Sequence, residues 1–163
     1  MKGSPLLELH VDDDGFVRAP VALVHRRLSA VDDWPTWWPG LRVRAMPPER
    51  APGAGADGPA QEVWALELPA APLRRLRVAA RLHDRRHEQG FLLALRGEVN
   101  GRAEFWLEPT GGGTVVHHLL TATVPSASSR RLQRDYRRAV RQGLWGLKDR
   151  LHLEARTSAG LVP

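Results

Sequence analysis

Between Gln61 and Val124 apolar and polar residues alternate with a period of two, and this run constrains the fold more than any other feature. A period of two is typical of strands that bury one face. The pattern covers five segments, 61–68, 74–84, 90–99, 102–108 and 114–124. The breaks between them are polar or rich in Pro and Gly, and Asn100-Gly101 predicts a two-residue hairpin. We therefore expect an antiparallel meander.

From Ser126 onward the spacing of apolar residues changes to three and four. This spacing predicts an amphipathic helix of about five turns, with Ser126, Ser128 or Ser129 as its N-cap. Arginines are concentrated in the first half of the helix. The apolar stripe consists of Leu132, Tyr136, Val140, Leu144, Leu147 and Leu151.

Upstream of the meander the sequence predicts a strand, a helix and a second strand. Residues 5–10 alternate as a strand does, and 12–15 are expected to form a turn. Pro20 favours a helix start, and the helix ends before Pro35. Residues 41–46 are read as a short strand.

Two segments break the regular pattern. The sequence DDWPTWWPG, residues 32–40, places three of the six tryptophans within five residues, together with two prolines. Residues 47–60 include seven Pro or Gly among fourteen, which predicts a mobile loop. We expect one domain over 1–156 and a flexible tail at 157–163.

Charge and composition exclude several classes of protein. The net charge is +6, and residues 126–156 carry all of this excess, so no nucleic-acid partner is expected. No apolar run is long enough to predict a membrane span. The chain has no cysteine and no signal-peptide pattern, which favours a cytoplasmic protein.

The order of elements predicts an α+β fold. A curved, seven-stranded antiparallel sheet would wrap around the long C-terminal helix, with one or two short helices between strands 1 and 2. A lipocalin-type barrel is disfavoured because it has no need of a five-turn apolar stripe. Space between sheet and helix would form a ligand cavity.

Three segments of the sequence resemble a known superfamily. They are APVALVHRRLSAVDDWPTWWPGL, GRAEFWLEPTGGGTVVHH and RRAVRQGLWGLKDRLHLEA. Together they are similar to SRPBCC, or START-like, helix-grip proteins, which include lipid-transfer domains, birch-pollen-allergen-like proteins and bacterial polyketide cyclase/dehydrase-like proteins. The resemblance implies the helix-grip fold and a cavity, but it leaves open carriers, cyclases, hydroxylase domains and sensors.

Within this fold the tryptophans of residues 32–40 are expected at one end of the cavity, as a hydrophobic lid or as ligand contacts. Gly143 and Gly146 lie inside the last helix, where they either let it seat closely on the sheet or leave room for a ligand. The full set of expected ligand-binding residues is Trp34, Trp37, Trp38, Trp64, Leu66, Phe105, His118, Tyr136, Val140, Gly143, Leu144 and Leu147.

Three polar side chains are candidates for chemistry. His118 is a polar anchor, a general base or a core histidine, and Tyr136 offers a hydroxyl to the cavity. Arg96 holds an anionic group if it points inward, and belongs to the solvated face if it does not. Adjacent strand residues face opposite ways, so His117 and His118 cannot share a metal ion, and neither a metal nor a cofactor is expected.

The expected function is binding of a small, largely apolar molecule, such as a polyketide, lipid or aromatic metabolite, in the cavity. One alternative is a metal-free polyketide cyclase or aromatase-like enzyme that uses the same cavity. A second alternative is an interaction protein whose Arg-rich helix face meets an acidic partner. Either a monomer or a dimer is compatible with the sequence.

Overall fold

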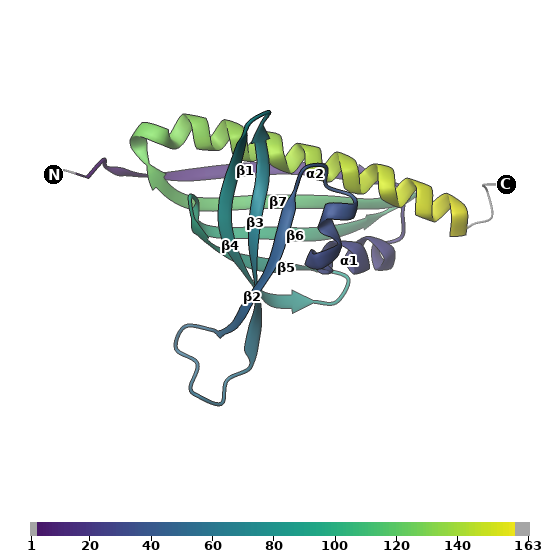
Figure 1. The fold of residues 1–163 in the computed structure, drawn as a ribbon. Helices are drawn as coiled ribbons and strands as arrows, with labels where there is room; N and C mark the ends of the chain where they lie inside the picture. The colour runs from purple at the N-terminus through teal and green to yellow at the C-terminus, as the bar shows by residue number, and fades with distance from the viewer. Residues whose placement is uncertain (1–2, 159–163) are drawn as a thin grey trace.

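A computed structural model describes residues 3–158 and contains one curved sheet, one long helix and short helical segments (Figure 1). The strands are β1 (Leu6–Val17), β2 (Arg42–Arg50), β3 (Ala60–Ala71), β4 (Arg74–Arg86), β5 (Gly90–Gly97), β6 (Asn100–Thr110) and β7 (Gly113–Pro125). The helical elements are α1 (Val21–Ser29), η1 (Val31–Thr36), η2 (Ser126–Ser128) and α2 (Ser129–Ser158).

The seven strands form a single antiparallel sheet in the order β1-β7-β6-β5-β4-β3-β2. Consecutive strands from β2 to β7 are neighbours, and β1 joins the far edge beside β7. α2 runs along β1 and also packs against β7 and β3, so that the curved sheet surrounds one side of the helix (Figure 1). The predicted helix-grip architecture is confirmed.

The apolar stripe of α2 forms one half of the core. All six predicted positions are buried, and Leu147 and Leu151 are completely inaccessible to solvent. Full burial of each such leucine stabilises the fold by roughly 1.5–3 kcal/mol. The opposite half comes from alternate strand residues such as Leu93, Phe105 and Leu120, as a period of two requires. Packing against the sheet, rather than helix propensity, therefore holds α2 in place.

β1 is longer than the sequence predicted, because residues 12–15 continue the strand instead of forming a turn. They pair in register with β7, with Asp13 opposite His118 and Gly15 opposite Val116. Asp13 faces α2, where its carboxylate accepts a hydrogen bond from Arg141 at 2.9 Å. Pairing with β7 and this ion pair override the turn preference of the Asp-rich sequence.

The β5–β6 turn also differs from the prediction. The connecting residues are Glu98 and Val99, whereas Asn100 and Gly101 belong to β6. The Asn100 side chain makes two hydrogen bonds to the backbone of Gly97, and Gly97 adopts a φ of +125°. Asn100 therefore closes the turn from its last position, and the prediction of an Asn-Gly hairpin loop was wrong.

The segment predicted as a loop at 47–60 is partly strand. β2 continues to Arg50, with a register shift after Met46, and β3 begins at Ala60, which leaves residues 51–59 between them. At the C-terminus α2 includes residues 157 and 158, and the rest of the predicted tail, 159–163, lies outside the described residues.

α1 and η1 cover one end of the sheet. α1 packs against β5, β6 and β7, and η1 contacts β2. The helix begins one residue later than predicted, because Pro20 is its N-cap and Val21 its first residue, and Pro35 lies inside the short η1. These two elements connect β1 to β2 and place the tryptophan segment against α2.

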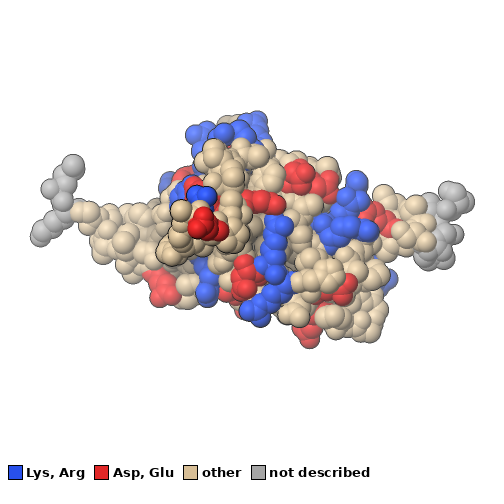
Figure 2. Space-filling model, turned by 90° about the horizontal axis from the view of Figure 1, so that it is seen from below, with Lys and Arg blue, Asp and Glu red and all other residues tan. Residues whose placement is uncertain are grey.

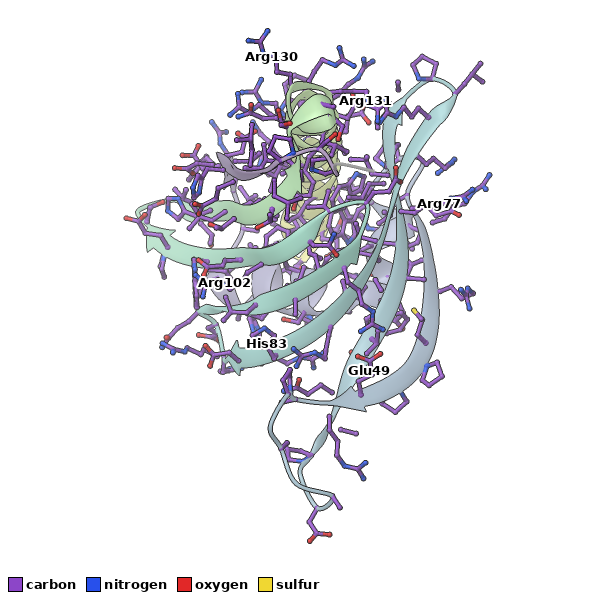
Figure 3. All side chains as sticks on the ribbon, turned by 90° about the vertical axis from the view of Figure 1, so that its left-hand side faces the viewer. Glu49, Arg77, His83, Arg102, Arg130 and Arg131 are labelled. Atoms are coloured by element: carbon purple, nitrogen blue, oxygen red, sulfur yellow. The ribbon has the colours of Figure 1, made fainter. Side chains whose placement is uncertain are left out.

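Charges are unevenly distributed over the surface. The face away from α2 carries acidic and basic side chains in mixture (Figure 2). The first half of α2 is different, because it bears closely spaced arginines, and Figure 3 shows Arg130 and Arg131 projecting from its start. Among residues 3–158 no helix is both long and hydrophobic enough to span a bilayer.

Candidate functional site

A polar pair lies deep between the sheet and α2. His118 comes from β7 and Tyr136 from the buried stripe of α2, and their side chains are joined by a hydrogen bond of 2.7 Å between Nε2 and Oη. Only 1% of His118 and 3% of Tyr136 is exposed. Strand parity directs His118 inward and His117 outward, where His117 contacts Glu108.

Burial keeps both members of the pair neutral near pH 7. Desolvation lowers the pKa of His118 to about 4, and the nearby Asp13 carboxylate and the Glu104 backbone offset this only in part. Desolvation raises the pKa of Tyr136 above its ordinary value. A neutral imidazole can accept a proton or a hydrogen bond, and the hydroxyl can donate one, so the pair is suited to a polar group on a bound molecule.

The tryptophans that the sequence placed at the end of the cavity fill the space beneath α2. Trp34, Trp37 and Trp38 are all buried, and the rings of Trp37 and Trp38 are stacked with centroids 5.9 Å apart. Trp34 donates a hydrogen bond to the carbonyl of Leu28 at 2.9 Å. By contrast, the indole nitrogens of Trp37 and Trp38 are buried and have no hydrogen-bond partner within residues 3–158.

An unbroken aromatic path connects these indoles to the polar pair. Trp38 lies 5.8 Å from Trp34, and Trp34 lies 6.0 Å from Phe105, measured between ring centroids. Phe105 lies 4.3 Å from His118, which completes the path to Tyr136. Residues from η1, β6, β7 and α2 thus form one aromatic column through the interior.

The two glycines of α2 seat the helix on this column. A Cβ at Gly143 would lie 2.5 Å from the indole of Trp38, and a Cβ at Gly146 would lie 1.8 Å from the carbonyl oxygen of Trp37. Neither distance is sterically possible without movement. The geometry therefore supports the packing interpretation of both glycines, and the room they leave is occupied by the tryptophan segment.

Most of the other predicted site residues lie in the core, and one lies at its margin. Leu66, Val140, Leu144 and Leu147 are buried in the core. Trp64 is half-buried at its margin, and its indole nitrogen donates to Glu62 at 3.2 Å. These residues line the same sheet–helix interface as His118.

Arg96 does not join the polar pair. It projects from the outer face of β5 and pairs with Glu49, with 2.7 Å between Nη1 and Oε2. This ion pair raises the pKa of the Arg96 guanidinium above its ordinary value. The side chain is therefore held away from the interior, as in the solvated alternative.

Two acidic side chains, the partly buried Asp13 and the buried Asp135, were not predicted as part of this region. Asp13 is the cross-strand neighbour of His118 and pairs with Arg141. Asp135 is 2% exposed and lies 3.2 Å from Arg74 of β4. The only sequence signal for Asp135 was its spacing of three from Leu132, which places it at the border of the apolar stripe. Asp13 was missed because residues 12–15 were expected to form a turn and not a strand.

The largest cavities described lie at the surface of the molecule. Among four cavities in the described part of the chain, none is lined by Trp34, Trp37, Trp38, His118 or Tyr136. The largest lies between the β3–β4 hairpin and α2, with a volume of about 1040 Å³. Buried aromatic side chains of the protein itself pack in the space beneath α2.

A second cavity, of about 570 Å³, lies on the outer face of α2 among Arg130, Arg134, Arg137 and Arg141. Trp145, which is 74% exposed, forms one end of it. Over residues 3–158 no cluster of three or more metal-ligating side chains is present.

Comparison with known proteins identifies the fold. The sequence matches no protein-family profile and no curated protein. Solved structures do match. The di-domain ARO/CYC StfQ from the steffimycin biosynthetic pathway aligns with a TM-score of 0.70 at 16% identity, over 94% of this chain and 53% of StfQ. This chain therefore spans about half the length of StfQ.

Two further structures match over nearly their whole length. A START superfamily protein from Mycobacterium smegmatis has a TM-score of 0.67 at 13% identity, over 88% of this chain and 97% of that protein. A KanY protein has a TM-score of 0.64 at 15% identity, with coverages of 89% and 98%. The chain has the START-like helix-grip fold.

Proposed function

We propose that this protein binds a small, largely apolar molecule between the sheet and α2, at the aromatic column. The observation that carries the proposal is the pair of buried indole N–H groups on Trp37 and Trp38, which have no acceptor among the described residues. An unsatisfied buried donor costs roughly 1–3 kcal/mol. A ligand oxygen in this region would remove that cost.

Binding at this position requires Trp37 or Trp38 to move, because their rings fill the interface. The segment that carries them contains two prolines and is connected to the sheet through η1 and β2, so it is separate from the strands that hold His118. Displacing an indole by a ligand exchanges one buried apolar surface for another. The hydrogen bonds made to the orphan donors then favour the ligand-bound state.

His118 and Tyr136 supply a polar contact at the inner end of the column. A hydroxyl or carbonyl on the ligand would insert between, or beside, the imidazole and the phenol. The apolar remainder would contact Phe105, Leu144 and the indoles. A mostly aromatic molecule with one or two oxygen atoms matches this arrangement best.

Two ligands that differ by one hydroxyl group test the proposal. We expect the protein to bind naphthalene and 1-naphthol saturably, with one molecule per chain, in a fluorescence titration. Tyr136→Phe should weaken the binding of 1-naphthol about tenfold, as the loss of one hydrogen bond predicts, and should leave the affinity for naphthalene unchanged. Trp145→Phe, on the exposed face of α2, should change the affinity for neither ligand. Absence of saturable binding, or equal effects of both substitutions, would contradict the proposal.

A second candidate is an enzyme of the cyclase class that uses the same region. The neutral His118 beside a hydroxyl is an arrangement that can relay a proton, and one neighbour of known structure is an ARO/CYC protein. Turnover of a poly-β-keto substrate by the wild type, and its loss in both His118→Ala and Tyr136→Phe, would distinguish this function from simple binding.

A further inference from the structure

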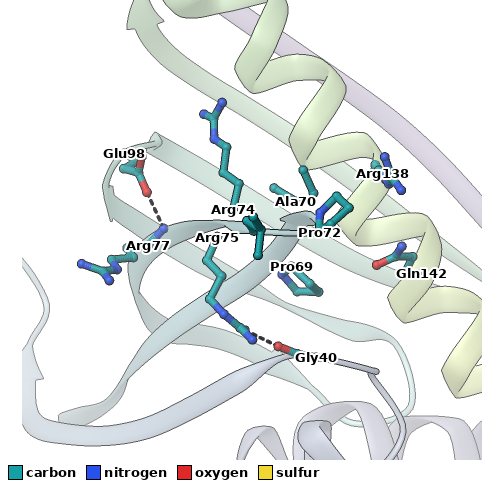
Figure 4. Close-up of a pocket in the computed structure, with 12 residues that line it drawn as sticks. Gly40, Pro69, Ala70, Pro72, Arg74, Arg75, Arg77, Glu98, Arg138 and Gln142 are labelled. Atoms are coloured by element: carbon teal, nitrogen blue, oxygen red, sulfur yellow. Dashed lines mark hydrogen bonds between the residues drawn. The ribbon is translucent and has the colours of Figure 1, made fainter.

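A large surface groove is built from two walls that lie close to the end of the tryptophan segment. One wall is the end of the β3–β4 hairpin, residues 69–75, and the other is the flank of α2 that carries Arg138 and Gln142 (Figure 4). Gly40, the last residue of the tryptophan segment, lies at the lower margin of the groove (Figure 4). The groove holds about 1040 Å³ and is separate from His118 and Tyr136.

Two of the arginines around this groove are compensated by carboxylates. Arg74 lies 3.2 Å from the buried carboxylate of Asp135. Arg77 lies 3.6 Å from Glu67, and its backbone N–H donates to Glu98 at 2.7 Å. Their charges are therefore balanced within the protein, and they are not the groups that attract a ligand.

Two other arginines, Arg75 and Arg138, have no carboxylate partner within residues 3–158. Arg75 donates to the carbonyl of Gly40, a neutral acceptor, so its positive charge stays uncompensated (Figure 4). Arg138 is exposed on α2 and makes no hydrogen bond or ion pair with any described residue. The guanidinium groups come from opposite walls, and a planar guanidinium is well suited to oxyanions.

Between these two charges the hairpin wall of the groove includes apolar residues. Pro69, Ala70 and Pro72 form the hairpin side of the groove. Gln142 is followed by Gly143, whose missing side chain admits the indole of Trp38. Trp38 thus packs against α2 at the residue next to Gln142, which lines the groove.

We propose that this groove binds the anionic group of a small amphipathic molecule, an oxyanion such as a carboxylate, sulfonate or phosphate attached to an apolar body. Arg75 and Arg138 hold the oxyanion, and the apolar body lies on the prolines and reaches toward Trp38. The inference rests on the proposed function, because the apolar body is the part that would occupy the interface behind Trp38.

Two fluorescent probes that share one aromatic body test the inference. 1-Anilinonaphthalene-8-sulfonate carries a sulfonate, and N-phenyl-1-naphthylamine does not. In wild-type protein at pH 7, the sulfonated probe should bind more tightly than the neutral probe. Added salt should weaken the binding of the sulfonated probe and leave that of the neutral probe unchanged. Arg138→Gln removes no contact with the described residues and should lower the affinity for the sulfonated probe roughly tenfold. The same substitution should leave the affinity for the neutral probe unchanged.

The matched control is Arg130→Gln, which removes the same charge from the same helix outside the groove. It should leave both affinities unchanged, whereas Arg75→Gln should reproduce the effect of Arg138→Gln. If Arg130→Gln weakens binding of the sulfonated probe as much as Arg138→Gln does, or if Arg138→Gln does not weaken it, the proposal that the groove binds an anion is wrong. Binding of the neutral probe would then still support the proposed function. If neither probe binds, the proposed function and this inference both fail.

Discussion

The indole of Trp38 occupies the space into which a side chain at Gly143 would project, 2.5 Å from the Cβ position of that residue. This relationship joins the tryptophan segment to α2. It explains why the helix tolerates a glycine in its interior, where glycine costs about 1 kcal/mol relative to alanine. It also identifies the residue that must move before a ligand can enter the interface.

Gly143→Ala should destabilise the protein although alanine is the better helix former. The added methyl group overlaps the indole of Trp38, and overpacking of this kind costs about 1–3 kcal/mol. We expect a net loss of about 1 kcal/mol or more in urea unfolding once the helix propensity is included. Gln142→Ala, one position earlier and exposed, should change stability by less than about 0.5 kcal/mol. Equal stabilities of the two variants would contradict the contact.

Tyr136→Phe should destabilise the protein by about 1–2 kcal/mol, because Nε2 of His118 loses its hydrogen-bond partner in a dry environment. His118→Phe in the same background should then cost less than it does alone, since the two substitutions remove one shared interaction. A double-mutant cycle measured by urea unfolding gives the coupling. Strict additivity of the two losses would show that the hydrogen bond contributes nothing.

The low pKa of His118 predicts that acid weakens the fold. The ordinary histidine pKa of 6.5 applies to the unfolded chain, whereas burial lowers the folded value to about 4. Between these values the unfolded state binds more protons, so the free energy of unfolding falls as the pH decreases through this window. The loss begins as the pH falls below about 6.5 and reaches about 3 kcal/mol near pH 4, at about 1.4 kcal/mol per pH unit.

The variant His118→Gln measures this contribution, because glutamine can accept the hydrogen bond from Tyr136 but does not titrate. Urea unfolding at pH 7 and pH 4.5 should show a smaller loss of stability for His118→Gln than for the wild type. The exposed His10 provides the control, and His10→Gln should retain the wild-type dependence. Identical pH dependence in all three proteins would show that His118 titrates normally.

Asp135 should act as a link between α2 and the β3–β4 hairpin. Its buried carboxylate lies 3.2 Å from Arg74, so Asp135→Asn weakens a charge-assisted contact worth about 1–3 kcal/mol. We expect Asp135→Asn and Arg74→Gln to destabilise the protein by similar amounts, and the double variant to be hardly worse than either. Independent, additive losses would indicate that the ion pair does not stabilise the fold.

The fold could be predicted from the sequence because each element has a clear period. The alternation from Gln61 to Val124 gave five strands, and the stripe from Leu132 to Leu151 gave α2 with the observed buried face. Local turn chemistry was less informative. Asp12 to Gly15 and Asn100-Gly101 both favour turns in isolation, but pairing with β7 incorporates both into strands.

The site could be predicted only in part. The helical spacing placed Tyr136 on the buried stripe of α2, and the family resemblance placed the tryptophans of residues 32–40 inside the fold, where all of them are buried together with His118. Their contacts depend on long-range packing, which periodicity does not encode: the seating of Trp38 against Gly143 and the pairing of Asp135 with Arg74 join residues far apart in the chain. The groove beside the hairpin depends on the same long-range arrangement.

The most direct test of the central claim, that a small apolar molecule binds beneath α2, is to record the indole N–H resonances of the ¹⁵N-labelled protein during titration with N-phenyl-1-naphthylamine. Trp37 and Trp38 have buried N–H groups that lack an acceptor among the described residues, whereas the side chain of Trp145 is exposed. The account predicts saturable shifts of the Trp37 and Trp38 resonances, with Trp145 unmoved. Shifts confined to Trp145, or no shift at all, would contradict it.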